Sequence, residues 1–527
     1  MAQGRCLAKG RLTARRGAIL RDTSVFIVFL AVFAVLAMGW LRNWTSHAPA
    51  VKWWTPCRPL RLATDCSGLG TAEIAADILA GSERSVHVVF ACDVWAASQK
   101  WLTKMGVSSL VLGNMNIRVW DVKAGVVKTK DHQGKPVTIS REHADLDIYV
   151  CGFMCMPFTT NGNRAGWKDE NAKTFWSSLK TIITLKPRVF VLENVKAISN
   201  NSNSEVVDKA MGKLSGYVVV TLKLDSKDYD VPQSRCRVYI VGLRMDGLPA
   251  ALGGKDNSIV QKLLQARLAK AACQTVPEPF PSWLSALGQS IVPSLQSSQS
   301  EEKGAESEAE SEAESDKKDK TVCSCGEGAV CPLHVCKCQK CVKYGVMKKK
   351  CIWRQTLIKF KKSAKALLQK REYLKQWRKI KNNPKLKHVP TYFELAERRG
   401  LATGHIKHPA KRCMLLVASQ HQNIMTKSAI MNYGKTFGRH QLRKDGLVPT
   451  LGHGCTTFFL PASAQCLTIP QLLCLSGFQP TVNKKVFKLA RHMKPADMGL
   501  MIGNSMCVPV VGHVMAVALG IISPKAS

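Results

Sequence analysis

The segment DIYVCGFMCMPFT, residues 147–159, runs from an apolar stretch into a loop that carries Cys155. A second segment, VFVLENV at residues 189–195, places Glu193 and Asn194 directly after another apolar stretch. Both stretches have the length and composition of buried strands. Because the carboxyl ends of parallel strands meet at one edge of a sheet, we expect Cys155 and Glu193 to converge there as a nucleophile beside an acid.

Short apolar runs alternate with helical stretches on both sides of these segments. The runs that we expect to be strands are residues 60–64, 87–91, 147–151, 188–192, 216–224 and 237–243, and helices are expected at 73–80 and 96–105. This alternation predicts an α/β fold built on a doubly wound sheet, in which ligands bind at the carboxyl ends of the strands.

A turn rich in small residues follows the first expected strand and leads into a helix. The residues of interest in this turn are Asp65, Cys66, Ser67, Gly68 and Gly70. Small residues let a ligand approach the backbone, and the first turn of a helix favours an anionic group. Taken alone, the turn fits a structural role as well as it fits a binding site.

Two acidic residues accompany this turn. Asp93, followed by Val94, lies just past the second expected strand, where a carboxylate can bind ribose hydroxyls. Asp121 follows residues 117–120, which we expect to be the next strand, and there it can accept a hydrogen bond from an adenine amino group. Each carboxylate alone fits a helix cap or a solvated loop charge equally well.

Gln233, Arg235 and Arg237 alternate before the last apolar run, so their side chains are predicted to share one face of a strand. Guanidinium groups on that face can hold a base carbonyl, a phosphate or the Glu193 carboxylate. An ordinary surface charge stripe is the simpler reading of such a pattern, but the apolar strand that follows at once argues against it.

In this order, the motifs resemble those of the cytosine-C5 DNA methyltransferase family. The resemblance covers residues 60–245 and resumes at 447–519, where GNSMCVPVV at 503–511 matches the family's closing element. It implies a Rossmann-like fold that uses S-adenosylmethionine and is interrupted by an inserted target-recognition region. It also assigns to the cofactor site the turn after the first strand, the two acidic residues with Val94, and Asn504, Ser505 and Val508.

The resemblance further implies methyl transfer to C5 of a cytosine that is flipped out of duplex DNA. Cys155 would add to C6 as the nucleophile, and Glu193 would assist at N3. Asn194 would fix the geometry of its loop. Arg235 would help to position the cytosine, and Arg237 would support the loop.

The sequence departs from the family's pattern at two places. Cys66 stands where the family usually has a phenylalanine that packs against adenine, so cofactor affinity is in question. Met154 and Met156 flank Cys155, and an apolar setting raises the pKa of a thiol. Two alternatives therefore stay open beside a DNA methyltransferase: a tRNA cytosine-5 methyltransferase, and a catalytically degenerate relative that binds DNA.

Charge and low-complexity segments divide the chain. Lys and Arg number 76 against 37 Asp and Glu, a net charge of +39 that favours nucleic acid, DNA or possible RNA, as the partner. The divisions that we expect are an N-terminal segment at 1–58, a catalytic core at 59–246, an insertion at 247–446 and a completion of the core at 447–527. The insertion contains a Glu-rich linker at 297–320, which we expect to be disordered.

Two further features of the insertion suggest ligands. The spacing of one cluster of soft ligands suits a structural zinc ion, although the four residues that would bind it are not decided; its members are Cys323, Cys325, Cys331, His334, Cys336, Cys338 and Cys341. Residues 348–387 then interleave Lys and Arg with aromatic side chains, a pattern that suits phosphates and exposed bases.

An uncharged apolar run at residues 25–41 lies near the N-terminus, after several arginines. A spanning helix needs roughly 17 to 25 apolar residues, so this run is a candidate membrane or targeting segment. The predicted chemistry suits a nucleus, and the 20 cysteines, which are clustered, suit a reducing compartment. A membrane segment conflicts with a nuclear location. A leader removed by processing or a start-site error would resolve this conflict.

Overall fold

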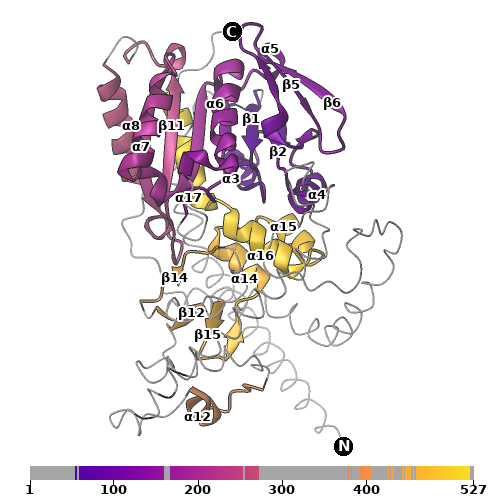
Figure 1. Cartoon of the computed structure of the whole chain (residues 1–527), viewed down its shortest axis with the longest axis vertical. Coiled ribbons are helices and arrows are strands. Elements are labelled where there is room, and N and C mark those ends of the chain that lie inside the picture. The colour runs from indigo at the N-terminus through magenta and orange to yellow at the C-terminus, as the bar shows by residue number, and fades with distance from the viewer. Residues whose placement is uncertain are drawn as a thin grey trace, which may run out of the picture.

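The computed structural model in Figure 1 describes part of the chain. The described residues are 51, 54–55, 58–159, 166–252, 256–271, 375, 378, 382, 392–404, 425, 429–432, 442–443, 445–452, 455 and 458–522. The apolar run at 25–41, the Glu-rich linker at 297–320 and the Cys/His cluster at 323–341 lie outside these residues. So does the basic stretch at 348–387, apart from three single positions.

A seven-stranded sheet forms the centre of the fold. In spatial order its strands are β3 (Val111–Leu112), β2 (Val86–Cys92), β1 (Leu60–Asp65), β7 (Ile148–Cys151), β8 (Val189–Val195), β11 (Cys236–Arg244) and β9 (Tyr217–Asp225). The first five strands are parallel, and β11 runs antiparallel to both of its neighbours. The order reverses at β1, which confirms the predicted doubly wound α/β sheet.

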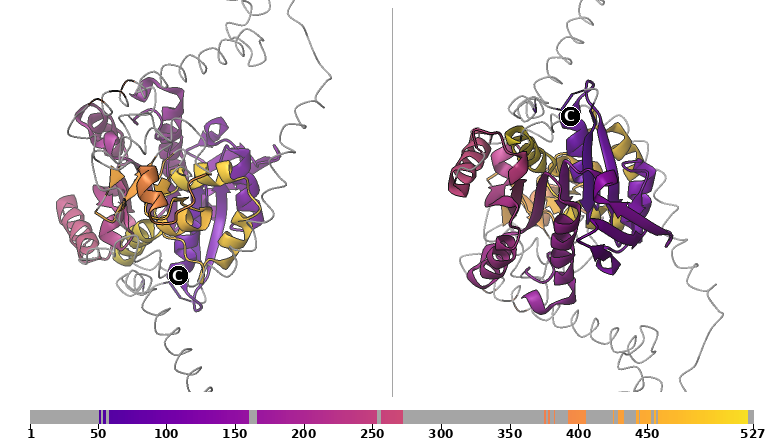
Figure 2. Two further views of the ribbon diagram at one scale, coloured as in Figure 1. Left: turned by 90° about the horizontal axis from the view of Figure 1, so that it is seen from below. Right: turned by 90° about the horizontal axis from the view of Figure 1, so that it is seen from above.

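Helices cover both faces of this sheet (Figure 2). The helices of the first face are α3 (Thr71–Ala80), α4 (Ala96–Met105), α8 (Asn257–Ala271) and α17 (Val508–Ile521). Those of the second face are α6 (Lys173–Leu185) and α7 (Asn201–Gly212). Because both faces are buried, the central strands are continuous apolar runs, which is why the sequence located them closely.

A small antiparallel sheet lies outside the central one and corrects one prediction. It contains β4 (Val119–Asp121), β5 (Val126–Lys130) and β6 (Pro136–Ser140), and it is followed by α5 (Arg141–Ala144). Residues 117–120 were expected to supply the third strand of the main sheet. That place is taken by the two-residue strand β3, and β4 instead pairs with β5.

The second half of the chain returns to the core. Strand β10 (Gln233–Ser234) pairs in parallel with β14 (Val448–Pro449), more than 200 residues later. The remaining elements are α12 (Tyr392–Glu397), β12 (Ile430–Asn432), β13 (Leu442–Arg443), β15 (Phe458–Leu460), β16 (Gln465–Cys466), α14 (Ile469–Leu475), α15 (Lys484–Ala490) and α16 (Pro495–Asn504). Short 3₁₀ turns occupy Met115–Ile117, Gly166–Lys168, Glu170–Ala172, Lys196–Ser199, Ser226–Tyr229 and Met245–Gly247.

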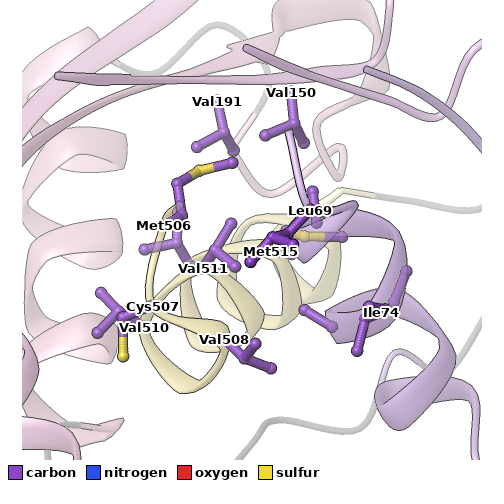
Figure 3. Close-up of a cluster of buried hydrophobic side chains, with 14 of the residues drawn as sticks. Leu69, Ile74, Val150, Val191, Met506, Cys507, Val508, Val510, Val511 and Met515 are labelled. Atoms are coloured by element: carbon purple, nitrogen blue, oxygen red, sulfur yellow. The ribbon is translucent and has the colours of Figure 1, made fainter. Parts of the chain in front are cut away.

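Helix α17 is buried between the sheet and α3. Figure 3 shows Val511 and Met515 of this helix beside Leu69, which lies in the turn between β1 and α3, and Val150 of β7. Within the described ranges, residues 495–521 are the stretch long and apolar enough to cross a membrane, yet 89% of the most apolar window is buried in the protein. This stretch therefore has the burial of a core element.

Candidate active site

The loop after β7 holds Cys155 at the carboxyl edge of the sheet. The carbonyl of Cys155 accepts hydrogen bonds from the backbone N–H groups of Phe158 at 2.9 Å and Thr159 at 3.1 Å. The N–H of Met154 donates to Thr174 Oγ1 at 3.1 Å, which ties the loop to α6. Cys155 is half-buried, so its thiol is held in a tight turn but is not sealed in the core.

Glu193 lies near the end of the neighbouring strand β8. Its Oε1 is 3.2 Å from Nε of Arg237, which projects from β11. The Nδ2 of Asn194 donates to the Phe153 carbonyl at 2.9 Å and so joins the β8 end to the cysteine loop. The structure therefore brings Cys155, Glu193 and Arg237 to one edge, with Asn194 as the link between the two loops.

Burial controls the ionisation of this group. Desolvation raises the pKa of the Cys155 thiol and the negative charge of Glu193 raises it further, while Arg237 and Arg235 act in the opposite direction. Desolvation also raises the pKa of Glu193, again opposed by the two arginines. The raised thiol pKa agrees with the apolar flanks seen in the sequence, although Met156 itself is exposed.

Gln233 and Arg235 make contacts that differ from their expected roles. Nη1 of Arg235 donates to the Leu451 carbonyl at 2.7 Å, and Nη2 donates to the Ser505 carbonyl at 2.5 Å. Nε2 of Gln233 donates to the Leu475 carbonyl at 2.6 Å. Both side chains are buried, and they fasten the C-terminal segment to the core. Arg235, expected at the cytosine, is thus committed to backbone carbonyls, and Arg237 is the arginine paired with Glu193.

The turn after β1 is held by an internal ion pair. Both carboxylate oxygens of Asp65 accept from Arg118, with Nη1 to Oδ2 at 2.6 Å, and Tyr149 Oη also donates to Oδ2 at 2.5 Å. All three side chains are buried. Asp65 was predicted to bind the cofactor, but its carboxylate is occupied by Arg118 and Tyr149 and holds the turn in place. Cys66 follows with a φ of 53°, in the left-handed region, and its Sγ lies 3.8 Å from Met115 Sδ.

Ser67, Gly68 and Asp93 connect the turns after β1 and β2. The Gly68 N–H donates to Asp93 Oδ2 at 2.9 Å, and the Cys92 N–H donates to Ser67 Oγ at 3.0 Å. Next to Asp93, the side chain of Val94 is 65% exposed. Gly70 has a φ of 73° and directly precedes α3, a conformation that glycine adopts without strain.

Asp121 lies away from this group. It is exposed at the end of β4, and its Oδ1 caps the Ala124 N–H at 2.9 Å. The first polar side chain after β3 is that of Asn114, which accepts a hydrogen bond from the Asn116 N–H. Sequence reasoning missed Asn114 because a two-residue strand gives a weak apolar signal, although Val111, Leu112 and a glycine do precede it.

The three residues predicted near the C-terminus differ in exposure. Asn504 ends α16 and is exposed, whereas Ser505 and Val508 are buried. Ser505 Oγ donates to the Ile502 carbonyl at 2.8 Å, and the Val508 N–H donates to the Ser476 carbonyl at 2.9 Å. Of the three, Asn504 is the one whose side chain is available to a ligand.

These residues fit a nucleoside that carries an amino acid. Val94 offers an exposed apolar surface beside Asp93, and Glu73, in the first turn of α3, holds a buried carboxylate oxygen with no hydrogen-bond partner in the described structure. An apolar surface suits a purine, and an unpaired carboxylate suits an ammonium group. The donor set therefore agrees with S-adenosylmethionine.

A zinc site is not tested by this structure. The Cys/His cluster at 323–341 lies outside the described residues, and within those residues no group of three or more potential ligands is placed to hold a metal ion.

The comparisons with known proteins identify the family of the chain. The family model described as C-5 cytosine-specific DNA methylase matches residues 119–518. Over 100 residues the chain is 34% identical to the type II methyltransferase M.NlaX of Neisseria lactamica. These residues make up 19% of this chain and 32% of the relative. M.HaeII of Haemophilus aegyptius is 37% identical over 101 residues, which cover 19% and 31%. The chain thus spans about a third of the length of these relatives.

Solved structures are also similar over part of the chain. S. pombe Dnmt2 methyltransferase is 17% identical, with a TM-score of 0.26 over 36% of this chain and 50% of that one. The Entamoeba histolytica methyltransferase EhMeth is 15% identical, with a TM-score of 0.27 over 35% and 53%. Because the family model matches well over half of the residues, the chain belongs to the C-5 cytosine-specific DNA methylase family.

Proposed function

We propose that the protein is a DNA (cytosine-5)-methyltransferase that acts on a cytosine flipped out of the duplex. The observation that carries this proposal is the convergence of Cys155 with the Glu193–Arg237 pair, whose atoms lie 3.2 Å apart at the carboxyl edge of the sheet. Family membership supports the reaction class. The net charge of +39 supports a polyanionic substrate, and on that basis we propose a nuclear location, with membrane or organelle targeting by residues 25–41 as the alternative.

Cys155 supplies the nucleophile in this mechanism. Its thiolate adds to C6 of the cytosine, which makes C5 electron-rich enough to attack an electrophile. When bound, S-adenosylmethionine supplies that electrophile as a sulfonium methyl group. Loss of the C5 proton and elimination of the thiolate then restore the aromatic ring. Because burial raises the pKa of this thiol, ionisation is the costly step that the site has to promote.

Glu193 supplies the proton that the adduct needs. Desolvation raises the pKa of Glu193, which favours the protonated carboxyl and lets it donate to N3 of the base. Arg237 contacts Oε1, and we assign the other carboxyl oxygen to the base. A carboxyl fixed in this way also selects cytosine over thymine, since thymine N3 carries its own hydrogen.

Methyl transfer from labelled S-adenosylmethionine to duplex DNA tests the proposal. We expect label in DNA with the full-length protein and none with Cys155→Ala. Cys466→Ala is the matched control, since this half-buried thiol lies on β16 outside the site, and it should keep full activity. Label in tRNA alone would show that the substrate is tRNA and not DNA. No label in either nucleic acid, with DNA binding retained, would reveal a degenerate binder.

A further inference from the structure

The outer face of α6 presents an aromatic side chain between two lysines. Lys173, Trp176 and Lys180 recur at spacings of three and four residues, so they share one face of the helix. All three are exposed, and Trp176 keeps 39% of its surface accessible. The opposite face, which includes Phe175 and Ile182, packs into the core. Because only that inner face has to be apolar, packing does not require an aromatic side chain on the outer one.

A chain of aromatic rings connects this face with the loop of Cys155. The ring centre of Phe158, three residues after the nucleophile, lies 4.7 Å from that of Trp167. The ring centre of Trp167 in turn lies 5.0 Å from that of Phe175 and 5.9 Å from that of Trp176. The outer face of α6 therefore begins beside the active-site loop, and a strand that leaves the site in this direction meets Trp176.

Trp176 meets its aromatic neighbours at steep angles. Its ring plane makes an angle of 71° with that of Phe175 and 55° with that of Trp167. Rings at such angles touch edge to face and do not stack in parallel. None of the described aromatic side chains is stacked in parallel on Trp176, so a flat ligand can still stack on the exposed part of this ring.

The lysines on either side of the ring supply positive charge. Lys173 Nζ lies 3.1 Å from Glu170 Oε1, but the two side chains are 63% and 84% exposed, and a surface pair of this kind contributes little. Asp169, the other carboxylate in this part of the chain, caps the turn before α6. Lys180 Nζ lies 5.0 Å from the ring centre of Trp120, a contact that does not neutralise its charge. Both ammonium groups can therefore bind an anion that arrives on this face.

A flat ring between two cations matches the chemistry of an unpaired nucleotide strand. Lysines bind phosphates, and an exposed aromatic ring stacks on a base of any sequence. Seven residues of helix span about 10 Å, so Lys173 and Lys180 are far enough apart to contact the phosphates on both sides of one stacked base. A base inside a duplex has both of its faces covered by neighbouring bases, so duplex DNA cannot use Trp176 in this way.

We propose that the outer face of α6 binds an unpaired nucleic-acid strand beside the active site. One base stacks on Trp176, and Lys173 and Lys180 contact the flanking phosphates. Single-stranded DNA and RNA share the chemistry that this face recognises. The site goes beyond methyl transfer, because binding there needs neither the cofactor nor Cys155. Its consequence for catalysis, a preference for substrates with an unpaired stretch next to the target cytosine, rests on the proposed function.

Fluorescence anisotropy of labelled oligonucleotides with the full-length protein tests this site. The probe is a single strand of about twelve nucleotides that contains adenine and thymine alone, so that no cytosine engages Cys155. The same sequence as a duplex, and as RNA, completes the set. We expect Trp176→Ala to raise the Kd for the single strand about tenfold and Trp176→Phe to keep most of the affinity, because a phenyl ring still stacks. The Kd for the duplex should change less than twofold. Lys180→Gln should weaken single-strand binding about threefold and reduce its salt dependence, since one phosphate contact is lost.

Two exposed side chains on the other face of the sheet are the matched controls. Ile259→Ala on α8 and Lys104→Gln on α4 should leave every affinity unchanged. A loss with DNA and RNA alike would assign the face to either strand, and a loss with one of them would identify the strand that binds. Equal losses for the single strand and the duplex would overturn the proposal. So would an unchanged single-strand affinity for Trp176→Ala, which would leave the face to a protein partner. Because the binding assay contains no cofactor, its failure is distinct from a failure of methyl transfer.

Discussion

Nη2 of Arg235 donates to the carbonyl of Ser505 at 2.5 Å, across 270 residues of sequence. The same guanidinium also contacts the Gly503 carbonyl at 3.3 Å, so it grips the backbone on both sides of Asn504. Arg237, two residues along, pairs with Glu193. The short segment where β10 passes into β11 thereby connects Glu193 with the C-terminal segment that carries Asn504.

Arg235→Met is expected to weaken cofactor binding more than DNA binding. The substitution removes the donors to Leu451, Gly503 and Ser505 and leaves their buried carbonyls unpaired. Without the hydrogen bonds from Arg235 to Gly503 and Ser505, the backbone no longer holds Asn504 in a fixed position. We expect the Kd for S-adenosylhomocysteine to rise about tenfold, which corresponds to about 1.4 kcal/mol.

The control for this experiment is Arg244→Met, at the opposite end of β11, where the guanidinium contacts Asp246. It should leave cofactor affinity unchanged in the same calorimetric titration. A larger loss of DNA affinity than of cofactor affinity for Arg235→Met would contradict the prediction. It would support the role expected from the sequence, in which Arg235 positions the cytosine.

Glu193→Gln is expected to speed the alkylation of Cys155. The negative charge of Glu193 raises the pKa of this thiol, so its removal increases the thiolate fraction at pH 8. Arg237→Gln should slow the reaction, since Arg237 lowers the same pKa. We expect changes of about three- to tenfold, on the scale of a shift of up to one pKa unit.

Iodoacetamide labelling of the Cys155 peptide, followed by mass spectrometry over a pH series, measures both rates. Glu205→Gln, an exposed carboxyl on α7, is the control and should have no effect. If Glu193→Gln and Arg237→Gln moved the rate in the same direction, charge would not be the cause.

Glu73→Gln is expected to change the pH dependence of stability in the ligand-free protein. The folded pKa of about 7 lies above the ordinary value of 4.5. The native state therefore holds its proton more tightly, and the stability that this provides is complete below pH 4.5 and lost as pH rises through 7. The loss amounts to at most about 3 kcal/mol.

Denaturant unfolding at pH 5 and pH 8 gives this comparison. The parent protein should lose stability between the two values relative to Glu73→Gln, which cannot ionise. A difference that did not depend on pH would show that Glu73 stays ionised when buried.

Gly242→Ala is expected to destabilise the core by about 1–3 kcal/mol. A Cβ at this position on β11 would lie 2.0 Å from the ring of Phe190, which is part of the adjacent strand β8. The two strands carry Arg237 and Glu193, so a displaced β11 also disturbs the ion pair. Gly216→Ala has nothing within 4 Å of the new Cβ and should stay within about 0.5 kcal/mol of the parent protein.

The architecture of the core can be predicted from the sequence alone. Strands buried on both faces must be continuous apolar runs, so the runs at 60–64, 147–151 and 188–192 marked β1, β7 and β8 to within a few residues. The edge at which these strands end follows from their parallel direction. That reasoning sufficed to place Cys155 and Glu193 together, because the residues just past a strand inherit its position.

Which polar side chains face a ligand, and which hold the protein together, depends on contacts between distant parts of the chain. Asp65 reads as a cofactor residue, yet Arg118 and Tyr149 occupy its carboxylate. Arg235 reads as a base contact, yet its partners lie 216 to 270 residues downstream. Glu73 reads as an ordinary acid in a first helical turn, yet its side chain is buried and its Oε2 has no hydrogen-bond partner among the described residues. Periodicity reports how a segment is buried, whereas a hydrogen bond depends on which distant atom arrives beside it, and no local pattern encodes that.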